Sequence, residues 1–348
     1  MRGLTFQGKE QISYDTAPDP EILKPEDVIV KVEWSAICGS DLHVYREHEK
    51  GLDLGTIMGH EFVGEIVETG SDVTKFSKGD HVVSPFTTSC GQCYYCKIGL
   101  TCRCEFGQLY GWVENGHGLH GAQAEYVRVP LADSTLFPIP KEANRKEFLF
   151  IGDILSTGYY CAENAEIKPD KTYVVIGCGP VGLMAIIGAL EQGATTVFAI
   201  DSVEDRLAKA SSFGAVPINF KSESPAEVIM QMTNGKGADA VMEVVGSISA
   251  QKMAMDLVRP GGIISTVGVH TSDNFAFSPV EAYDKNLTFK IGRCPARHYM
   301  DQLSSIVLEQ KYDLKSIISH EMPLTDGAEA YRIFDEKLDN SLKILLHP

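Results

Sequence analysis

The pattern of hydrophobic and polar positions changes near residue 150. Before that point, short stretches with strand character are interrupted by Gly, Pro and Asp, which is typical of an irregular β-rich domain. Examples of such stretches are Val28–Val32, Phe62–Glu68 and Gln123–Val129. The first part of the chain therefore predicts a β-rich domain with many loops.

After residue 150, apolar runs of strand length alternate with helical stretches. Tyr173–Ile176 and Val197–Ile200 are such runs, and Val181–Leu190 between them has a helical pattern. Similar runs follow at Asp239–Val245 and Ile263–Val269, and the pattern loosens again from about residue 292. Apolar strands that alternate with helices predict a doubly wound α/β fold, with a parallel sheet covered on both faces.

These changes predict two domains of different construction. A length of 348 residues also favours two domains, at about 150 residues each. We expect residues 154–291 to form the parallel-sheet domain. Residues 1–153 and 292–348 are then expected to form one β-rich domain together.

The composition restricts the partners and the compartment. The chain has 31 basic and 47 acidic residues, a net charge of −16, which would repel the phosphates of nucleic acids and anionic membranes. No stretch approaches the roughly 18 apolar residues of a membrane span, and the first residues do not resemble a secretory signal. We expect a cytoplasmic protein with no nucleic-acid or membrane partner, whose nine cysteines stay reduced or bind metal.

Four closely spaced cysteines form the most specific motif of the chain. Cys90, Cys93, Cys96 and Cys104 follow the spacing C-x2-C-x2-C-x7-C, and Gly91 gives the first turn the freedom that a metal loop needs. Four thiolates fill the tetrahedral coordination of zinc, so we expect a structural site that leaves no position for substrate. A disulfide framework is the alternative, although it suits small secreted chains. The negative charge argues against a nucleic-acid-binding zinc ribbon.

A glycine-rich turn directly follows the strand predicted at Tyr173–Ile176 and opens the next helix. It reads Gly177-Cys178-Gly179-Pro180-Val181-Gly182, a G-x-G-x-x-G fingerprint whose strand–turn–helix context makes it specific. Gly177 permits the tight turn, Gly179 lets the backbone approach a pyrophosphate, and Gly182 allows close packing of the helix. The helix N-terminus stabilises the anion, so we expect a dinucleotide cofactor here.

Asp201 ends the second strand of this unit and bears on the choice of cofactor. A carboxylate there accepts hydrogen bonds from both adenosine ribose hydroxyls and would repel a 2′-phosphate, which favours NAD over NADP. Arg206 suits either a 2′-phosphate or the ribose 3′-hydroxyl. NADP therefore stays as the alternative.

A second group of metal-binding residue types precedes the cysteine cluster. Cys38 is followed closely by Ser40 and His43, and His60 is followed by Glu61. The sulfur of a cysteine and the nitrogen of a histidine both suit zinc. Each residue alone has an ordinary alternative, because a single cysteine is usually a small buried hydrophobe and a single histidine a satisfied polar residue.

Together these residues resemble the zinc-dependent medium-chain alcohol dehydrogenase family over nearly the whole chain. The resemblance is carried by the segment from Gly59 to Gly70, by the Cys90–Cys104 lobe and by the Gly177–Gly182 fingerprint. It implies a GroES-like catalytic domain and a Rossmann cofactor domain with two zinc ions per chain. It also implies a small-molecule alcohol or aldehyde substrate and a homo-oligomer, either a tetramer or a dimer.

Within this family the chain is most similar to the branch related to formaldehyde dehydrogenases, through residues 121–127 and 152–159. In that branch the aspartate that matches Asp153 is the third zinc ligand, where other branches carry cysteine. The resemblance thus implies a catalytic zinc held by Cys38, His60 and Asp153 with one open position. It makes Glu61 an inner-sphere or adjacent carboxylate.

The resemblance also assigns roles around that zinc. Ser40 and His43 match a proton relay, Phe86 lies beside the substrate, and Trp112 is a further candidate for the pocket. Because metal coordination lowers the pKa of bound water from about 16 to about 7, zinc would make the hydroxyl proton easy to lose. We expect Ser40 to accept this proton and to pass it through the ribose to His43, while hydride goes to nicotinamide.

Three residues at the end of the predicted strand Ile263–Val269 bear on the nicotinamide. Val267, Gly268 and Val269 would present backbone groups to its carboxamide, although a plain strand end is the ordinary alternative. Family members that hold NAD permanently carry a long loop over the cofactor, and no such insertion lies between Gly246 and Gly261. We therefore expect the cofactor to be released in each turnover.

Other function classes share only part of these features. A zinc-free quinone reductase of the same superfamily lacks the cysteine lobe, and a zinc-binding interaction protein has no need for Ser40 or His43. A polyol or amino-alcohol dehydrogenase of the threonine type has the same zinc chemistry. It remains the alternative to a dehydrogenase of simple alcohols or aldehyde adducts.

Overall fold

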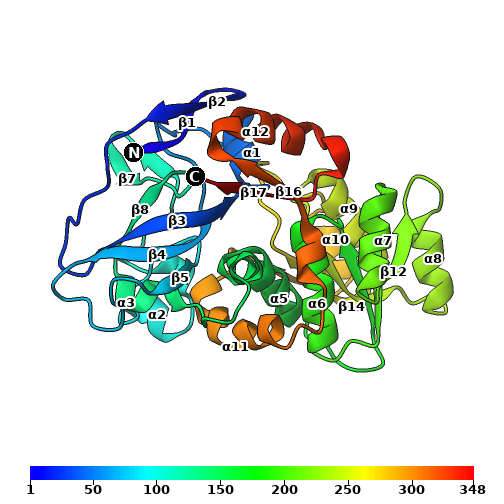
Figure 1. The fold of residues 1–348 in the computed structure, drawn as a ribbon. Helices are drawn as coiled ribbons and strands as arrows, with labels where there is room; N and C mark the ends of the chain where they lie inside the picture. Colours follow the sequence, from blue (N-terminus) through cyan, green and yellow to red (C-terminus); the bar gives the residue numbers. More distant parts are fainter. The chain divides into compact units, whose positions relative to one another are not determined.

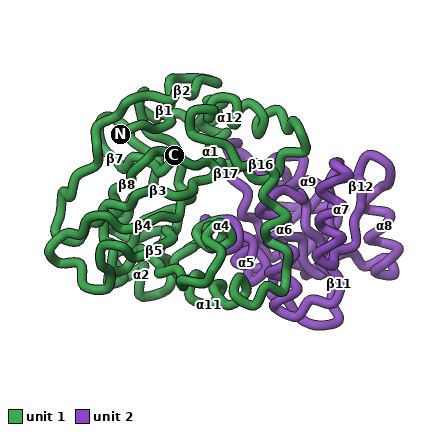
Figure 2. The backbone as a smooth tube through the Cα atoms, in the orientation of Figure 1, with its two compact units in different colours: residues 1–153, 295–348 green, residues 154–294 purple.

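The computed structural model describes residues 1–348, which divide into two compact units (Figure 2). Unit 1 comprises Met1–Asp153 and Pro295–Pro348, and unit 2 comprises Ile154–Cys294. Unit 1 is thus made from two stretches of chain, and unit 2 is the continuous segment that connects them.

Unit 1 contains a seven-stranded sheet and two separate hairpins (Figure 1). The strand order of the sheet is β16-β17-β3-β4-β5-β9, and β8 pairs with β3. The strands are β3 (Val28–Ala36), β4 (Glu61–Thr69), β5 (His81–Ser84), β8 (Tyr126–Val129), β9 (Phe137–Pro138), β16 (Ile318–Pro323) and β17 (Lys343–His347). The hairpins join β1 (Arg2–Gly8) to β2 (Gln11–Thr16) and β6 (Trp112–Glu114) to β7 (His117–Leu119).

The helices of unit 1 are mostly short. They are α1 (Asp41–Tyr45), α2 (Tyr94–Lys97), α3 (Ala132–Thr135), α4 (Arg145–Phe148), α11 (Ala296–Leu308) and α12 (Gly327–Glu336). Single 3-10 turns are η1 (Thr101–Arg103), η2 (Leu149–Gly152), η3 (Leu314–Ile317), η4 (Leu324–Asp326) and η5 (Leu338–Asn340). Loops therefore connect most of the strands, as the frequent Gly, Pro and Asp predict.

Two hydrophobic cores stabilise unit 1. On β3, the alternate residues Val28, Val30 and Val32 pack with apolar side chains of β4, β5 and β8. The second core joins the first hairpin, α1 and α12, and Leu4, Leu42 and Tyr331 belong to it. Strand β17 runs antiparallel to β3, with Leu345 opposite Ala36, so the last strand of the chain lies beside the segment that leads to the predicted metal residues.

Unit 2 is a six-stranded parallel sheet with the order β12-β11-β10-β13-β14-β15. Its strands are β10 (Thr172–Ile176), β11 (Thr196–Asp201), β12 (Val216–Asn219), β13 (Ala238–Glu243), β14 (Val258–Thr266) and β15 (Thr288–Ile291). Its helices are α5 (Ile154–Asn164), α6 (Pro180–Glu191), α7 (Glu204–Ser212), α8 (Pro225–Met232), α9 (Ile248–Leu257) and α10 (Pro279–Asp284). Counted within the unit, this order is 3-2-1-4-5-6, that of the Rossmann fold, so the predicted doubly wound fold is confirmed.

One strand of unit 2 ends earlier than the sequence pattern predicts. The apolar run Ile263–Val269 suggests a strand through Val269, but β14 ends at Thr266 and the next three residues lie in the following loop. The backbone leaves the sheet where it packs closely on the loop after β13. A Cβ on Gly268 would lie only 2.2 Å from the Gly246 nitrogen.

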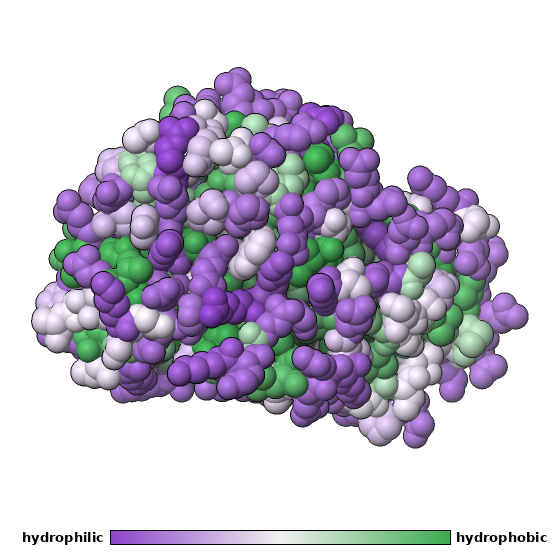
Figure 3. All heavy atoms as spheres, viewed as in Figure 1, coloured by the Kyte–Doolittle hydropathy of each residue, from purple (hydrophilic) through white to green (hydrophobic).

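The surface and helix lengths bear on the environment of the protein. Hydrophilic and hydrophobic residues are intermixed over the face drawn in Figure 3. None of the helices has both the length and the apolar character that crossing a membrane requires.

Candidate functional site

Four acidic or metal-binding side chains converge in unit 1 near the start of β4. Cys38 follows the end of β3, His60 and Glu61 lie at the start of β4, and Asp153 follows η2. One donor atom from each residue lies within 4.8 Å of all the others, and all four residues are buried. The structure therefore brings together residues that are up to 115 positions apart in the sequence.

The distances within this group suit a shared cation. The Asp153 Oδ2 atom lies 3.4 Å from the Cys38 Sγ and 3.3 Å from the His60 Nε2. The Ser40 Oγ lies 3.3 Å from the same His60 nitrogen. The Phe86 ring meets the His60 ring edge-on, with 6.4 Å between the ring centroids. Thus Ser40 and Phe86 flank the donor group, and Phe86 is buried.

The electrostatics of the group also favour a cation. Burial raises the pKa of Cys38 to about 11, and the negative charges of Asp153 and Glu61 add to this effect. Burial raises the pKa of Glu61 to about 7, although Lys343 opposes the shift. The Glu61 Oε2 atom is buried and has no hydrogen-bond partner. A divalent cation would favour the thiolate and satisfy such a carboxylate, so sulfur, nitrogen and oxygen donors here fit zinc.

A buried carboxylate outside this group orients the His60 ring. The Asp41 Oδ1 lies 3.2 Å from the His60 Nδ1, and the Asp41 Oδ2 accepts a hydrogen bond of 2.9 Å from the Cys38 backbone nitrogen. An acceptor at Nδ1 places the ring proton there and leaves the Nε2 lone pair toward Asp153 and Cys38. Asp41 was not among the predicted site residues, although a carboxylate between a cysteine and a histidine of the metal-binding type is a usable signal.

Lys343, the first residue of β17, was also not among the predicted site residues. Its Nζ donates hydrogen bonds to the Glu61 carboxylate and, at 3.2 Å, to the Ile37 carbonyl oxygen. Burial opposes the charge on Lys343, but Glu61 and the other nearby acidic groups outweigh burial and raise its pKa. The available signal is a lysine at the head of the apolar strand Lys343–His347, because a buried lysine requires a partner.

The four cysteines of the predicted structural site also converge in unit 1. The sulfur atoms of Cys90, Cys93, Cys96 and Cys104 lie within 4.8 Å of one another. Backbone N–H groups point at two of these sulfurs: Cys90 N lies 3.2 Å from the Cys104 Sγ, and Cys93 N lies 3.3 Å from the Cys90 Sγ. Such hydrogen bonds favour thiolates over thiols. None of the nine cysteines of the chain forms a disulfide bond, so no disulfide framework is present.

In unit 2 the glycine fingerprint lies at the turn between β10 and α6. Gly177 has a φ of +96°, and a Cβ on Gly182 would lie 1.8 Å from the Gly177 carbonyl oxygen. The turn can therefore form only with glycine at these positions. A Cβ on Gly179 would come near only one side-chain atom, the Arg206 Nη1 at 3.8 Å, so other side chains do not crowd the Gly179 backbone beside the α6 N-terminus, where Pro180 and Val181 begin the helix.

Asp201 is the last residue of β11 and lies next to this turn. Its Oδ2 accepts a hydrogen bond of 2.7 Å from the Cys178 backbone nitrogen, and its Oδ1 accepts from the nitrogens of Ser202 at 2.6 Å and Val203 at 3.0 Å. A carboxylate has about four acceptor positions, so room remains for further donors. The fold thus holds Asp201 firmly beside the fingerprint.

The loop after β14, which contains Val267, Gly268 and Val269, is anchored to β13. His270 follows these residues, and its Nε2 lies 3.0 Å from an oxygen of the fully buried Glu243. Glu243 also accepts hydrogen bonds from the backbone nitrogens of Val245 and Gly246, at 2.7 and 2.8 Å. Neither His270 nor Glu243 was predicted as part of this site.

Two further predicted residues, His43 and Trp112, contact residues outside the donor group. His43 belongs to α1, one turn after Ser40, and its ring centroid lies 6.4 Å from that of His48. Trp112 of β6 packs on the core that contains Leu42 and Tyr331, and its indole nitrogen lies 3.4 Å from a Glu114 oxygen. Their roles stay predictions.

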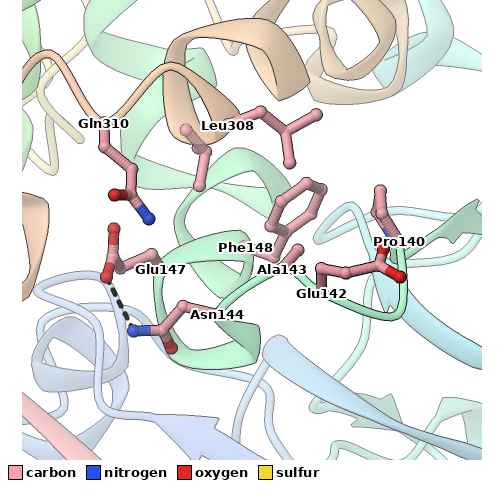
Figure 4. Close-up of a pocket in the computed structure, with 9 residues that line it drawn as sticks. Pro140, Glu142, Ala143, Asn144, Glu147, Phe148, Leu308 and Gln310 are labelled. Atoms are coloured by element: carbon pink, nitrogen blue, oxygen red, sulfur yellow. Dashed lines mark hydrogen bonds between the residues drawn. The ribbon is translucent and has the colours of Figure 1, made fainter.

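Unit 1 has other polar features that do not match this chemistry. A hollow of about 190 Å³ lies between α4 and the end of α11, where Phe148 and Leu308 face each other and the Asn144 amide donates to Glu147 at 2.7 Å (Figure 4). It contains none of the predicted site residues.

A third donor group, Glu33, Glu65 and His81, is already partly neutralised, because Arg145 binds both oxygens of Glu33 at 2.7 and 2.8 Å.

Comparison with known proteins agrees with this arrangement. The profile of the alcohol dehydrogenase GroES-like domain matches residues 24–141, and that of the zinc-binding dehydrogenase family matches residues 180–308. Zinc-type alcohol dehydrogenase B of Aspergillus flavus is 43% identical over 343 residues, which cover 96% of this chain and 79% of that protein. The glutathione-independent formaldehyde dehydrogenase of Bacillus subtilis is 33% identical, with 96% and 94% of the two chains covered.

Solved structures give the same answer. The alcohol dehydrogenase TADH from Thermus sp. ATN1 superimposes with a TM-score of 0.93 at 38% identity, covering 100% of this chain and 99% of its own. Both domain profiles, the sequence relatives and the structural match thus agree on one assignment. The chain belongs to the zinc-dependent medium-chain alcohol dehydrogenase family.

Proposed function

We propose that this zinc-dependent alcohol dehydrogenase transfers hydride from an alcohol or an aldehyde adduct to NAD, with Cys38, His60 and Asp153 as ligands of the catalytic zinc. The observation that carries the proposal is the convergence of these three donors and Glu61 in a buried group within 4.8 Å. Cys90, Cys93, Cys96 and Cys104 would hold a second, structural zinc, because four thiolates leave no coordination position open.

The charge of the donor set supports a catalytic role. An ionised Cys38 and Asp153 with a neutral His60 balance the two positive charges of zinc, and three ligands leave a position for substrate. Zinc held there would supply a Lewis acid that favours loss of the substrate hydroxyl proton. Glu61 adds a carboxylate whose free oxygen is buried beside the ligands. It is therefore suited to assist the exchange of water and product.

Ser40 and His43 are the residues that would move the proton. The Ser40 hydroxyl lies 3.3 Å from the His60 Nε2, on the side where the predicted ligands converge, so it can accept a proton from a substrate hydroxyl. His43 lies on the same helical turn, and its backbone nitrogen donates a hydrogen bond of 3.1 Å to the Ser40 backbone carbonyl oxygen. Because histidine titrates near neutral pH, His43 is suited to release the proton to solvent. Phe86 would form part of the wall beside the substrate.

The preference for NAD rests on Asp201. Its charge lies beside the fingerprint, where it would repel the 2′-phosphate of NADP and accept hydrogen bonds from ribose hydroxyls. Arg206 reaches the vicinity of Gly179, and it is the residue that would favour NADP instead. Steady-state kinetics with both cofactors decides between the two roles.

We further propose that the chain forms a homo-oligomer. The support lies in unit 2, where Val280 and Tyr283 on α10 are 67% and 83% exposed. Large apolar side chains at this exposure are common in subunit interfaces. Light scattering on the purified protein measures the oligomeric state, and a mass of one chain would contradict this proposal.

A metal and activity assay tests the proposed function. Purified protein is expected to contain two zinc ions per chain and to reduce NAD with a panel of simple alcohols, formaldehyde adducts, polyols and threonine. Cys38→Ser is expected to lose one zinc ion and at least about 100-fold in kcat/KM, since even partners of metal ligands contribute about 10- to 100-fold. The matched control is Cys161→Ser, a buried thiol of unit 2 beside Ser265.

The outcomes separate the alternatives. Preference for polyols or threonine over simple alcohols and aldehyde adducts would favour the second candidate function, which uses the same zinc residues. Full activity and two zinc ions in Cys38→Ser would contradict the proposed ligand set. Equal losses in Cys38→Ser and Cys161→Ser would indicate a general effect of removing a buried thiol.

A further inference from the structure

We infer that Gln123 and Tyr331 are positioning residues for the metal site, because they hold the carboxylate that orients His60. The inference rests on the proposed function, in which His60 is a zinc ligand. It assigns a role to the segment 121–127, and it connects α12 to the site through a chain of buried side chains.

The chain of contacts runs from α12 to the His60 ring. The Tyr331 hydroxyl donates to the Gln123 Oε1 at 2.9 Å, and the Gln123 Nε2 lies 3.5 Å from the Asp41 Oδ2. The Asp41 Oδ1 in turn lies 3.2 Å from the His60 Nδ1. Gln123 and Tyr331 are fully buried, and Asp41 and His60 are 4% and 9% exposed. Water therefore cannot readily replace any of these partners.

The contacts of Gln123 allow only one orientation of its amide. The Nε2 group faces two acceptors, the Ala36 carbonyl oxygen at 3.1 Å and the Asp41 carboxylate, while the Oε1 atom faces a hydroxyl donor. A flipped amide would turn its oxygen toward two acceptors and its N–H groups toward Tyr331. The Tyr331 hydroxyl thus helps to keep an N–H group directed at Asp41.

The backbone around Gln123 is tied to the turn that carries His60. The backbone nitrogen of Gln123 donates to the Met58 oxygen, and that of Ala122 donates to the Gly59 oxygen, both at 2.9 Å. Gly59 has a φ of +90°, and a Cβ there would lie 2.4 Å from the Gln123 Cγ. The turn before His60 is therefore packed directly against the Gln123 side chain, so Gln123 supports both His60 and its orienting carboxylate.

The expected effect is on metal retention. Substitution of a partner that orients a metal-ligating histidine typically lowers metal affinity or activity by about 10- to 100-fold. Tyr331 acts through Gln123 and Asp41, so we expect the lower end of this range, an increase of about tenfold in the rate at which the less tightly held zinc is lost. Gln123→Met, which removes both polar ends of the amide, is expected to have a larger effect than Tyr331→Phe.

The experiment measures zinc release from the purified enzyme to a chromogenic chelator. Zinc from the Cys38 site and from the four-cysteine site is expected to leave in two separate phases, of which Cys38→Ser abolishes one. Tyr331→Phe is expected to accelerate that same phase about tenfold and to leave the other unchanged. The matched control is Tyr45→Phe. Tyr45 is a buried tyrosine whose ring centroid lies 5.4 Å from that of Tyr331, but its hydroxyl takes no part in this chain of contacts.

Each outcome distinguishes this inference from the proposed function. If Cys38→Ser abolishes one phase and neither Tyr331→Phe nor Gln123→Met changes it, the positioning role is wrong and the ligand set stands. If Cys38→Ser keeps both phases, the ligand set itself is wrong. Equal acceleration in Tyr331→Phe and Tyr45→Phe, or acceleration of both phases together with a lower melting temperature, would show a general loss of packing and overturn the inference.

Discussion

Replacing Lys343 with methionine tests how the Glu61 carboxylate is held. Lys343 is 1% exposed, Glu61 is fully buried, and the two form an ion pair. Methionine keeps much of the length and apolar volume of lysine but removes its charge. The loss of stability therefore reports mainly the ion pair and not a cavity.

The size of this loss depends on pH. Because burial raises the pKa of Glu61, the folded state loses stability as pH rises from the unfolded pKa toward the folded one. Between pH 4.5 and about pH 7 this effect lowers the free energy of unfolding of the parent protein by roughly 3 kcal/mol. Without Lys343 the pKa of Glu61 rises further, because the charge that lowers it is gone. In the variant, the loss of stability with rising pH therefore continues above neutral pH.

We expect a difference between parent and variant that changes with pH. Removal of one partner of a buried ion pair costs about 3 to 5 kcal/mol, so the variant is expected to be less stable by about 3 kcal/mol near pH 8.5. Near pH 5.5 the cost should fall below about 1 kcal/mol, because Glu61 is then protonated in both proteins and the ion pair between Glu61 and Lys343 is already lost in the parent.

Urea unfolding followed by tryptophan fluorescence measures this difference. Both tryptophans of the chain, Trp34 and Trp112, belong to unit 1, so the signal reports that unit. The measurement is made after dialysis against a chelator, since a cation beside Glu61 would lower its pKa. Lys343→Arg should retain most of the stability. Lys146→Met, which breaks a partly exposed ion pair with Glu321, should cost less than about 1 kcal/mol. A cost for Lys343→Met that is the same at both pH values would refute the reasoning.

Three further predictions concern the two metal sites, the cofactor and the proton. Cys93→Ser should lower the melting temperature with little change in activity per folded molecule. Cys38→Ser should instead lower the activity per folded molecule with little change in the melting temperature, and thermal scans and kinetics measure both quantities. Asp201→Ala should narrow the preference for NAD over NADP by at least about tenfold, roughly 1.4 kcal/mol, in kcat/KM; a parent preference for NADP would instead assign control to Arg206. His43→Ala should slow turnover near neutral pH and recover partly in imidazole buffer, and an unchanged pH profile would show that the proton leaves by another route.

The fold and the family could be predicted because their signals are local. The strand, glycine turn and helix from Tyr173 to Leu190 are contiguous, and the cysteine spacing from Cys90 to Cys104 lies within one loop region. The strand predicted at Ile263–Val269 begins five residues earlier, at Val258, and ends three residues earlier, at Thr266, since apolar residues continue past Thr266 while the backbone turns to pack on the loop after β13. Hydrophobicity records burial, and it does not record which backbone groups pair.

The predicted zinc ligands are brought together by the fold, but the groups that support them were not predicted. Lys343 lies 282 positions from Glu61, and Tyr331 lies 208 positions from Gln123. A lysine, a glutamine and a tyrosine have no characteristic spacing, and each is common in other roles. Only the pairing of β17 with β3 and the packing of α12 on the first hairpin place them at the site.

The late position of β17 also constrains how the protein forms during synthesis. The residues proposed to bind both zinc ions lie in the first stretch of unit 1, and the whole of unit 2 is synthesised before Lys343. Domains generally fold as they emerge from the ribosome, so unit 2 can fold while the sheet of unit 1 still lacks its sixth and seventh strands, β16 and β17. During that interval Glu61 has neither its lysine nor the burial that β17 provides. The proposed ligands are thus available to zinc in the nascent chain while the neighbouring carboxylate is still exposed to water, and the last strand then closes the surroundings of the proposed site.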